Sequence, residues 1–341
     1  MYSFTNDYSE GAHPKVLDLM LKSNFEQNSG YGNDIHCSKA REYIKELIHN
    51  NDADIHFISG GTQANLLVIS SFLRPHQATI SADTGHIIGH ETGAIEATGH
   101  KVISVPGKEG KLTPESISFG LKQNCEEYTP RPKVVYISNS TELGTVYTKS
   151  ELTAIHNLCK KENLILFLDG ARLGSALTSK MNDLTLKDIA ELVDVFYIGG
   201  TKNGALLGEA LVIIRDDLKE DFRYLMKQRG AMLAKGFVLG MQFQALFEDN
   251  LFFELGQYAN EKAEQIWDVL KEHKILFLAE PCSNQIFPIL SNDLLKEFSE
   301  KFSYNIIEKM DDDYTAIRLV TSWATTQESV KALIEFFEKN A

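Results

Sequence analysis

The chain has 341 residues, of which 43% are hydrophobic and 24% are charged, so it can form one large globular domain with a smaller one beside it. Its net charge of -13 disfavours nucleic acid and anionic membranes as partners, because both are bound by basic surfaces. A small-molecule substrate is the default expectation.

The sequence lacks the signals of export and of metal binding. Its four cysteines, Cys37, Cys125, Cys159 and Cys282, show neither metal-ligand spacing nor the pattern of a disulfide framework. The N-terminal segment has no basic region followed by an apolar one, and no later stretch is apolar for long enough to span a bilayer. We therefore expect a cytoplasmic protein with reduced thiols and no bound metal.

Seven short apolar runs, rich in β-branched residues, alternate with helical patterns. This alternation predicts an α/β fold in which a mostly parallel, seven-stranded sheet is covered by helices on both faces. The last run follows the sixth after too few residues for a crossover helix, so we expect it to pair antiparallel or to lie at an edge. The runs are 55–59, 78–82, 101–105, 133–137, 164–169, 193–198 and 209–214.

The pattern changes after the last of these runs. Residues 216–273 are helical in pattern, and the stretch 237–247 is apolar around much of its surface, which indicates burial in a core or against another subunit. A small α/β unit follows, with strand candidates at 275–278, 285–290 and 316–321 and helices at 293–302 and 327–339. We predict an N-terminal arm (1–15), a large domain (16–250) and a small C-terminal domain (251–341).

Two reactive side chains follow two of the predicted strands. Asp169 closes the run 164–169, and Lys202 comes four residues after the run 193–198. Open α/β sheets place ligands at the carboxyl ends of their strands, so both side chains should border one site. A lysine beside flexible glycines suits an amine that forms an imine, and a nearby aspartate suits a ring nitrogen. Together they predict a pyridoxal phosphate enzyme, with Lys202 as the Schiff-base lysine.

A phosphate site is a further possibility after the first predicted strand. Gly60, Gly61 and Thr62 open a helix that we expect to extend to about Leu73, with Thr62 at its cap. Backbone N–H groups at such a helix start bind phosphate, although a plain turn is the commoner reading of this pattern. The nucleotide-binding pattern Gly-x-x-x-x-Gly-Lys-[Ser/Thr] does not occur.

Several other side chains are candidates for the same site. His86 follows the second predicted strand, where its ring could lie over an aromatic cofactor and transfer a proton; a solvated loop histidine is the alternative, and His90 and His100 lie near. Arg172 suits a carboxylate or a phenolate oxygen. Arg318 lies inside an apolar strand, where it needs either an anionic ligand or a structural ion pair.

These motifs occur in a recognisable order. They are Asn6-Asp7 with Gly11 and Pro14, Tyr31-Gly32-Asn33-Asp34, Gly61-Thr62 with Ala64-Asn65, His86 with Glu91 and Gly93-Ala94, residues 140–147, Asp169-Gly170-Ala171-Arg172, residues 199–204 with Gly208-Glu209-Ala210, and Arg318. The ordered set resembles the low-specificity L-threonine aldolases over essentially the whole chain. Those enzymes use pyridoxal phosphate and have the aspartate-aminotransferase fold type, known as fold type I.

The resemblance implies a larger site and a reaction. Lys202 would hold the cofactor, His86 would stack on its ring, and Asp169 would contact its pyridine nitrogen. The implied activity cleaves L-threonine, L-allo-threonine and related β-hydroxy-α-amino acids to glycine and an aldehyde. Further implied residues are Gly61, Thr62 and Thr201 near the phosphate, Arg172 beside cofactor and substrate, Arg318 at the substrate carboxylate, Tyr31 and Asn6 at the substrate, and Arg229 or Lys235 reaching the phosphate from a second subunit of a homodimer or homotetramer.

The chain departs from the family pattern at two places. Asn6 stands where serine is common, and Ser140-Thr141-Glu142 stands where better-known members have Asn-Thr-His. That histidine is often assigned to the substrate hydroxyl, so the base is in question here, and we favour His86 over Glu142. A β-eliminating lyase, an aminotransferase and a non-catalytic cofactor-binding protein remain the alternatives.

Overall fold

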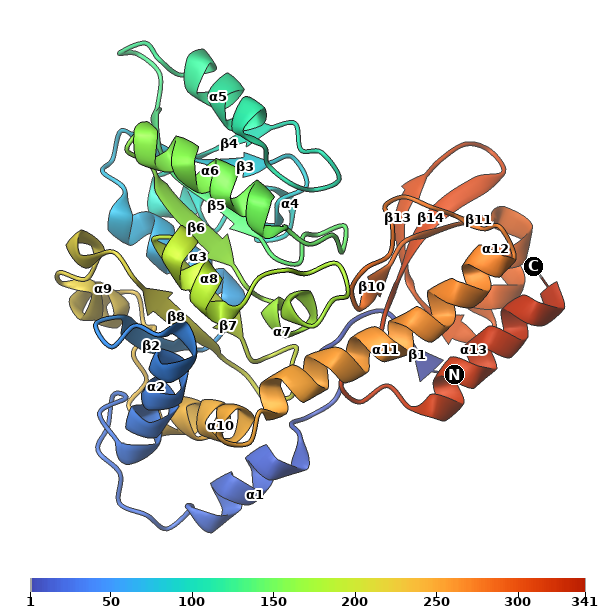
Figure 1. Cartoon of the computed structure of the whole chain (residues 1–341), viewed down its shortest axis with the longest axis horizontal. Helices are drawn as coiled ribbons and strands as arrows, with labels where there is room; N and C mark the ends of the chain where they lie inside the picture. Colours follow the sequence, from blue (N-terminus) through green and yellow to red (C-terminus); the bar gives the residue numbers. More distant parts are fainter. Residues whose placement is uncertain (1, 341) are drawn as a thin grey trace.

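The computed structural model describes residues 2–340, and a seven-stranded sheet forms its larger part (Figure 1). The strand order is β2-β8-β7-β6-β5-β3-β4, with β8 antiparallel to both of its neighbours. All seven predicted strands are confirmed; for the last one, antiparallel pairing is correct and the edge position is wrong. The strands are β2 (Asp54–Ile58), β3 (Gln77–Ala82), β4 (Lys101–Val105), β5 (Arg131–Ser138), β6 (Ile165–Asp169), β7 (Val195–Gly199) and β8 (Glu209–Ile213).

Both faces of this sheet are buried, as the continuous apolar runs predict. Successive side chains of a strand point to opposite faces, so Val135 and Ile137 of β5 enter one core while Val134 and Tyr136 enter another. Helices α2 (Ile35–Ile48), α5 (Pro114–Gln123), α6 (Lys149–Lys161), α8 (Leu186–Leu192) and α10 (Phe237–Glu248) contribute to the first core, and α3 (Gly61–Phe72) and α9 (Phe222–Gln228) to the second. Shorter or peripheral helices are α1 (Pro14–Lys22), α4 (His86–Gly89), α7 (Leu173–Leu177) and the 3-10 turns Glu96–Thr98 and Asp216–Leu218.

The apolar helix α10 is buried within its own chain. Residues 239–247 are all buried, and the helix packs against α2 and α1. The core alternative for this stretch is therefore correct. Phe237 and Val238, at the start of the helix, are half-buried, and a contribution to a subunit interface stays a prediction.

A smaller unit follows in the sequence and lies beside the large sheet (Figure 1). Its sheet has the order β10-β14-β11-β9, with β13 also paired to β14. The N-terminal arm belongs to this unit in space, because β1 pairs with β12 and Phe4 lies in the small core. The elements are β1 (Tyr2–Ser3), β9 (Leu276–Phe277), β10 (Gln285–Ile286), β11 (Pro288–Ser291), α12 (Asn292–Ser299), β12 (Phe302–Ser303), β13 (Asn305–Lys309), β14 (Tyr314–Val320) and α13 (Gln327–Asn340).

One long helix, α11 (Leu251–Glu272), connects the two units (Figure 1). Its first turns contribute Leu251, Phe252 and Leu255 to a core of the large unit. Its later turns contribute Ala263 and Leu270 to the core of the small unit. The division at residues 15 and 250 stays a prediction. Within residues 2–340, no helix is both long and apolar enough to cross a membrane.

Candidate active site

The loops that follow β6 and β7 approach each other closely. The backbone N–H of Gly199 donates to the carbonyl of Gly170 at 2.9 Å. A side chain at Gly170 would place its Cβ 1.9 Å from the carbonyl oxygen of Tyr197, and one at Gly199 would place its Cβ 2.3 Å from that of Ala171. Only glycine permits this approach. It brings together the loops that carry Asp169 and Lys202, as their positions after neighbouring strands predict.

Lys202 lies in a charged and desolvated environment. Burial lowers the pKa of its amine, and the neighbouring Arg172 lowers it further; Asp7, Asp169 and Glu209 oppose the shift. A lowered pKa increases the fraction of neutral amine, which is the form that attacks a carbonyl carbon.

A buried glutamate supports the Lys202 loop. Glu209, at the start of β8, accepts a hydrogen bond from Thr201 Oγ1 at 2.9 Å and from the Gly200 N–H at 3.1 Å. Burial raises the pKa of Glu209 to about 8, against the opposing effects of Thr201 and Lys202. The Thr201 hydroxyl thus uses its hydrogen inside the protein, and in this arrangement it has none left to donate to a phosphate oxygen.

Asp169 is buried at the end of β6 and accepts three hydrogen bonds. Its Oδ2 accepts from Tyr136 Oη at 2.5 Å and from Asn65 Nδ2 at 3.2 Å, and its Oδ1 accepts from the Ala171 N–H at 3.0 Å. Burial and the nearby Asp169 raise the pKa of Tyr136 well above its usual range, so this phenol keeps its proton and remains a donor. Oδ1 accepts only one of these bonds, which leaves it capacity for a further N–H donor.

The contacts of Asp169 continue into a closed circuit. Asn65 Nδ2 also donates to Glu91 Oε1 at 2.7 Å, and Glu91 Oε1 contacts His86 Nδ1 at 2.9 Å. The His86 backbone N–H donates to Glu142 Oε1 at 2.9 Å. Ser138 Oγ closes the circuit with contacts to Glu142 Oε1 at 2.7 Å and to the Tyr136 hydroxyl at 3.4 Å. We call this set the polar ring; its members are Asn65, His86, Glu91, Tyr136, Ser138, Glu142 and Asp169.

Glu142 occupies the place of the family's histidine, and the structure puts it in the polar ring. Burial raises the pKa of Glu142, whereas the hydrogen bond from Ser138 lowers it. The His86 backbone N–H and Ser138 Oγ both donate to the same oxygen of Glu142, Oε1. Its carboxylate is therefore held by the fold rather than turned to solvent.

Arg172 is held by the N-terminal arm. Its Nε donates to Asp7 Oδ2 at 2.7 Å and its Nη2 donates to Asp7 Oδ1 at 3.0 Å, while Asn284 Nδ2 donates to the same carboxylate at 2.9 Å. The Asp7 side chain is 1% exposed. Although burial would raise the pKa of Asp7, Arg172 and Lys202 hold it below its usual value. One edge of the guanidinium is thus occupied, and Nη1 remains for a ligand.

Arg318 of β14 lacks a carboxylate partner within the described part of the chain. Its Nη2 donates to the Thr5 carbonyl at 3.3 Å and to Asn305 Oδ1 at 3.1 Å, and its Nε is buried without a hydrogen-bond partner. Burial and Arg172 both lower the pKa of Arg318. Of the two sequence alternatives, a structural ion pair is not found among residues 2–340, and an anionic ligand stays a prediction.

The start of α3 differs in detail from the prediction. Gly60, not Thr62, is the N-cap, and it provides no side-chain cap hydrogen bond. Thr62 is an exposed residue in the first turn, because the helix begins at Gly61. The prediction of Thr62 as the cap is therefore wrong. An uncapped first turn does, however, leave backbone N–H groups for an anion.

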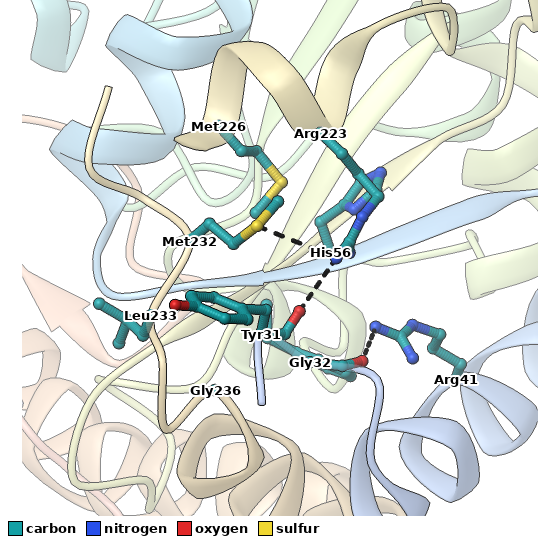
Figure 2. Close-up of a pocket in the computed structure, with 10 residues that line it drawn as sticks. Tyr31, Gly32, Arg41, His56, Arg223, Met226, Met232, Leu233 and Gly236 are labelled. Carbon is teal, nitrogen blue, oxygen red and sulfur yellow. Dashed lines mark hydrogen bonds between the residues drawn. The ribbon is translucent and has the colours of Figure 1, made fainter. Parts of the chain in front are cut away.

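Tyr31 lies beside Arg223 and Met226 of α9 (Figure 2). Its ring is 4.8 Å from Lys227 Nζ, and its carbonyl accepts from Arg223 Nη2 at 3.1 Å. It lines a cavity of about 20 Å³ with Arg41, room for roughly one ordered water. Its contacts are thus with α9 and with the segment that follows it, where its N–H donates to the Ala234 carbonyl at 3.1 Å, and a role at the substrate stays a prediction.

The remaining predicted residues lie in exposed or self-contained positions. Arg229 and Lys235 are exposed in the connection between α9 and α10. Asn6 Oδ1 accepts from the Tyr8 N–H at 2.9 Å and from Ser9 Oγ at 3.0 Å, so it forms a local turn. Roles for these three residues stay predictions.

Sequence reasoning missed several members of the site. Asn65, Glu91, Glu209 and Asp7 were recognised only as landmarks without a role, and Tyr136 was not singled out. Tyr136 had one usable signal: a tyrosine inside the apolar run 134–137, near the carboxyl end of a buried strand, needs a partner for its hydroxyl.

The comparisons with known proteins agree with this geometry. The family model described as beta-eliminating lyase matches residues 6–292. A curated relative, the low specificity L-threonine aldolase of Pseudomonas sp., is 32% identical over 340 residues, which cover 97% of this chain and 95% of the relative. The chain belongs to the family of low-specificity L-threonine aldolases.

Solved structures extend the comparison to the fold. A structure of Leishmania major threonine aldolase matches with a TM-score of 0.98 and 52% identity, covering 99% of both chains. An aspartate aminotransferase of Thermus thermophilus matches with a TM-score of 0.73 at 13% identity, covering 100% of this chain and 92% of the other. The predicted fold class, shared by threonine aldolases and aminotransferases, is therefore confirmed.

Proposed function

We propose that this protein is a carbon–carbon lyase that uses pyridoxal 5'-phosphate to cleave L-threonine, L-allo-threonine and related β-hydroxy-α-amino acids into glycine and an aldehyde. The observation that carries the proposal is the convergence of Lys202 and Asp169 with two guanidinium groups, Arg172 and Arg318. An amine and a ring-nitrogen partner suit the cofactor, and paired guanidinium groups suit the carboxylate of an amino acid. The family relationship narrows the substrate to β-hydroxy-α-amino acids.

The residues present fit the cofactor. The uncapped start of α3 at Gly61 offers N–H groups to a phosphate, and Lys202 offers an amine with a lowered pKa. Asp169 Oδ1 has capacity for the N–H of a protonated ring nitrogen. When bound, pyridoxal phosphate supplies an electron sink for the pair left on Cα when the Cα–Cβ bond breaks.

The proposed substrate-binding site contains residues of both units. Arg172 of the large unit is pre-oriented by Asp7, and Arg318 of the small unit has a buried, unpartnered Nε. A carboxylate between them would satisfy Nε and balance the positive charge of Arg318, because Asp7 already pairs with Arg172. Substrate binding would therefore join the large and small units.

Bond cleavage requires a base near the substrate hydroxyl. As the Cα–Cβ bond breaks, the base accepts the hydroxyl proton and the O–H electron pair becomes the second bond of the aldehyde carbonyl; Cα then receives a proton to give glycine. We assign the base to His86, whose side chain is 37% exposed and therefore accessible to a substrate.

We further propose that the protein assembles with shared active sites. Most of α10 is buried within its own chain, whereas Leu21, Phe25 and Ile35, near α1 and the start of α2, are 76%, 94% and 57% exposed. Such apolar exposure suits a second copy. A fully active monomer in light scattering at the assay concentration would contradict this.

Product analysis tests the activity. The yellow holoprotein is incubated with L-threonine and with L-allo-threonine, and the acetaldehyde and glycine produced are measured. We expect equal amounts of the two products. The family description also names β-elimination, which would give a keto acid and ammonia instead. Transamination would give amino-group exchange without an aldehyde, and a protein without turnover would give none of these products.

A further inference from the structure

Glu91 is a buried carboxylate for which the reaction above provides no role. Its side chain is fully buried, and within residues 2–340 its Oε2 has no hydrogen-bond partner. Its other oxygen, Oε1, contacts both Asn65 Nδ2 at 2.7 Å and His86 Nδ1 at 2.9 Å. Burying a carboxylate costs folding free energy, because the charge is removed from water. Its position against the ring of His86 therefore calls for an explanation.

The hydrogen bonds of Asn65 fix the orientation of its side-chain amide. Asn65 Nδ2 carries two hydrogens and lies within hydrogen-bond distance of two carboxylates, Glu91 Oε1 and Asp169 Oδ2. Both acceptors require the amide nitrogen, not its oxygen, so the orientation of Asn65 is settled. Asn65 therefore donates to the same oxygen of Glu91 that contacts His86, and it helps to hold this carboxylate in place.

The second contact of Glu91 Oε1 determines the tautomer of His86. An ionised carboxylate only accepts hydrogen bonds, so Nδ1 of His86 carries the ring hydrogen and Nε2 keeps its lone pair. The His86 backbone N–H is also held, by Glu142 Oε1. The residue is thus anchored at its backbone and at one ring nitrogen, and only Nε2 is left to act on a substrate.

We propose that Glu91 is a positioning residue that sets His86 in the Nδ1–H tautomer and stabilises the positive charge on its ring when Nε2 accepts the hydroxyl proton. This rests on the proposed function, because it deepens the role of His86 in cleavage. Asn65 links the arrangement to Asp169, so the partner of the ring nitrogen and the base are aligned through one amide.

The first test is a measurement on the unaltered holoprotein. Nitrogen-15 NMR of histidine-labelled protein, with the His86 signals assigned by comparison with His86→Asn, reports which ring nitrogen carries hydrogen. We expect hydrogen on Nδ1. A His86 with hydrogen only on Nε2 would overturn the proposal, because a protonated Glu91 would then be the donor. This result does not depend on turnover, so it stands even if the protein does not cleave threonine.

The second test removes the charge of Glu91 in two backgrounds. In the otherwise unaltered holoprotein, Glu91→Gln should lower kcat about 100-fold or more at similar cofactor content and Tm, because a glutamine can donate to Nδ1 and select the wrong tautomer. In the His86→Asn background the same change should lower kcat less than about threefold, because the residue it acts through is gone.

The outcomes are distinct. An equal loss in both backgrounds, or no loss in either, would overturn the proposal. Glu151→Gln is the matched control, since Glu151 caps α6 and pairs with Lys111 outside the polar ring, and it should leave kcat unchanged. Absence of aldehyde from the unaltered protein would instead count against the proposed function.

Discussion

Asp7 contacts Arg172 through both carboxylate oxygens, at 2.7 and 3.0 Å, although 165 residues separate them in the sequence. This ion pair joins the N-terminal arm to the site and fixes the guanidinium before any substrate arrives. We expect Asp7→Asn to raise the KM for threonine about tenfold or more and to change kcat less, because binding is the step that loses a pre-oriented group.

The same substitution should reduce stability. Removing one partner of a buried ion pair costs about 3–5 kcal/mol of unfolding free energy. Glu191→Gln, which removes the exposed pair with Lys187, is the control and should cost no more than about 1 kcal/mol. Equal losses in denaturant unfolding, or an unchanged KM, would show that the Asp7 contact is not needed to hold Arg172.

Lys202→Ala should abolish covalent attachment of the cofactor, because the amine with the lowered pKa is removed. The purified variant should lose its visible absorbance band and retain no cofactor after borohydride reduction. A variant that still fixes cofactor upon reduction would exclude Lys202 as the attachment site. Lys180→Ala, at an exposed lysine paired with Glu264, serves as the control.

Asp169→Asn should reduce turnover far more than it reduces stability. With its single oxygen toward Ala171, the amide still accepts that N–H, but it loses the oxygen that accepted from Tyr136 and no longer stabilises a protonated ring nitrogen. We expect kcat to fall about 100-fold or more, with Tm changed by only a few degrees. The comparison of kcat with thermal unfolding decides this, and equal turnover in the two proteins refutes the assignment.

Glu209 should make the stability of the cofactor-free protein depend on pH. Its usual pKa of 4.5 applies in the unfolded chain, whereas burial raises it to about 8 in the folded protein. The folded protein therefore holds a proton that the unfolded chain releases, and this contribution is complete below about pH 4.5 and lost as the pH rises to about 8.

Glu209→Gln keeps the shape but cannot titrate. We expect its unfolding free energy to fall less between about pH 5 and pH 8 than that of the unaltered protein, as measured by urea unfolding at both values. Lys202 titrates in both proteins, so the comparison isolates Glu209 to a first approximation. Parallel pH dependence in the two proteins would mean that Glu209 is already ionised when folded.

The base for the hydroxyl proton can be assigned by two substitutions. His86→Asn should lower the cleavage rate about 100-fold while the cofactor still binds, because Nε2 is the free nitrogen of an anchored ring. Glu142→Gln should do less, since Glu142 Oε1 already accepts from Ser138 and from the His86 backbone. A larger loss for Glu142→Gln at equal cofactor occupancy would make the carboxylate the base.

The sheet and its two reactive residues could be predicted because their signals are local. Each strand is a short apolar run, and Asp169 and Lys202 follow their strands directly. The partners of these residues could not be predicted in the same way. Asn65 reaches Asp169 across 104 positions, and Glu142 meets the backbone of His86 across 56, so these pairs depend on the packing of α3 and α4.

The small unit shows the same limit. Its helices and its longest strand were predictable, but the pairing of β1 with β12 was not, because two-residue strands have no periodic pattern. The turn at Tyr31 likewise takes a left-handed conformation, with φ of 62°, that a non-glycine residue rarely adopts. Tertiary contacts with α9 decide where its side chain lies.

The helix α11 places apolar side chains in two cores at once, one at each end. Unfolding of either core would expose to water the apolar side chains that α11 places in that core. It would also free one end of the helix whose other end packs in the second core. The two units should therefore lose their structure in one cooperative transition rather than one after the other, even though each has its own sheet.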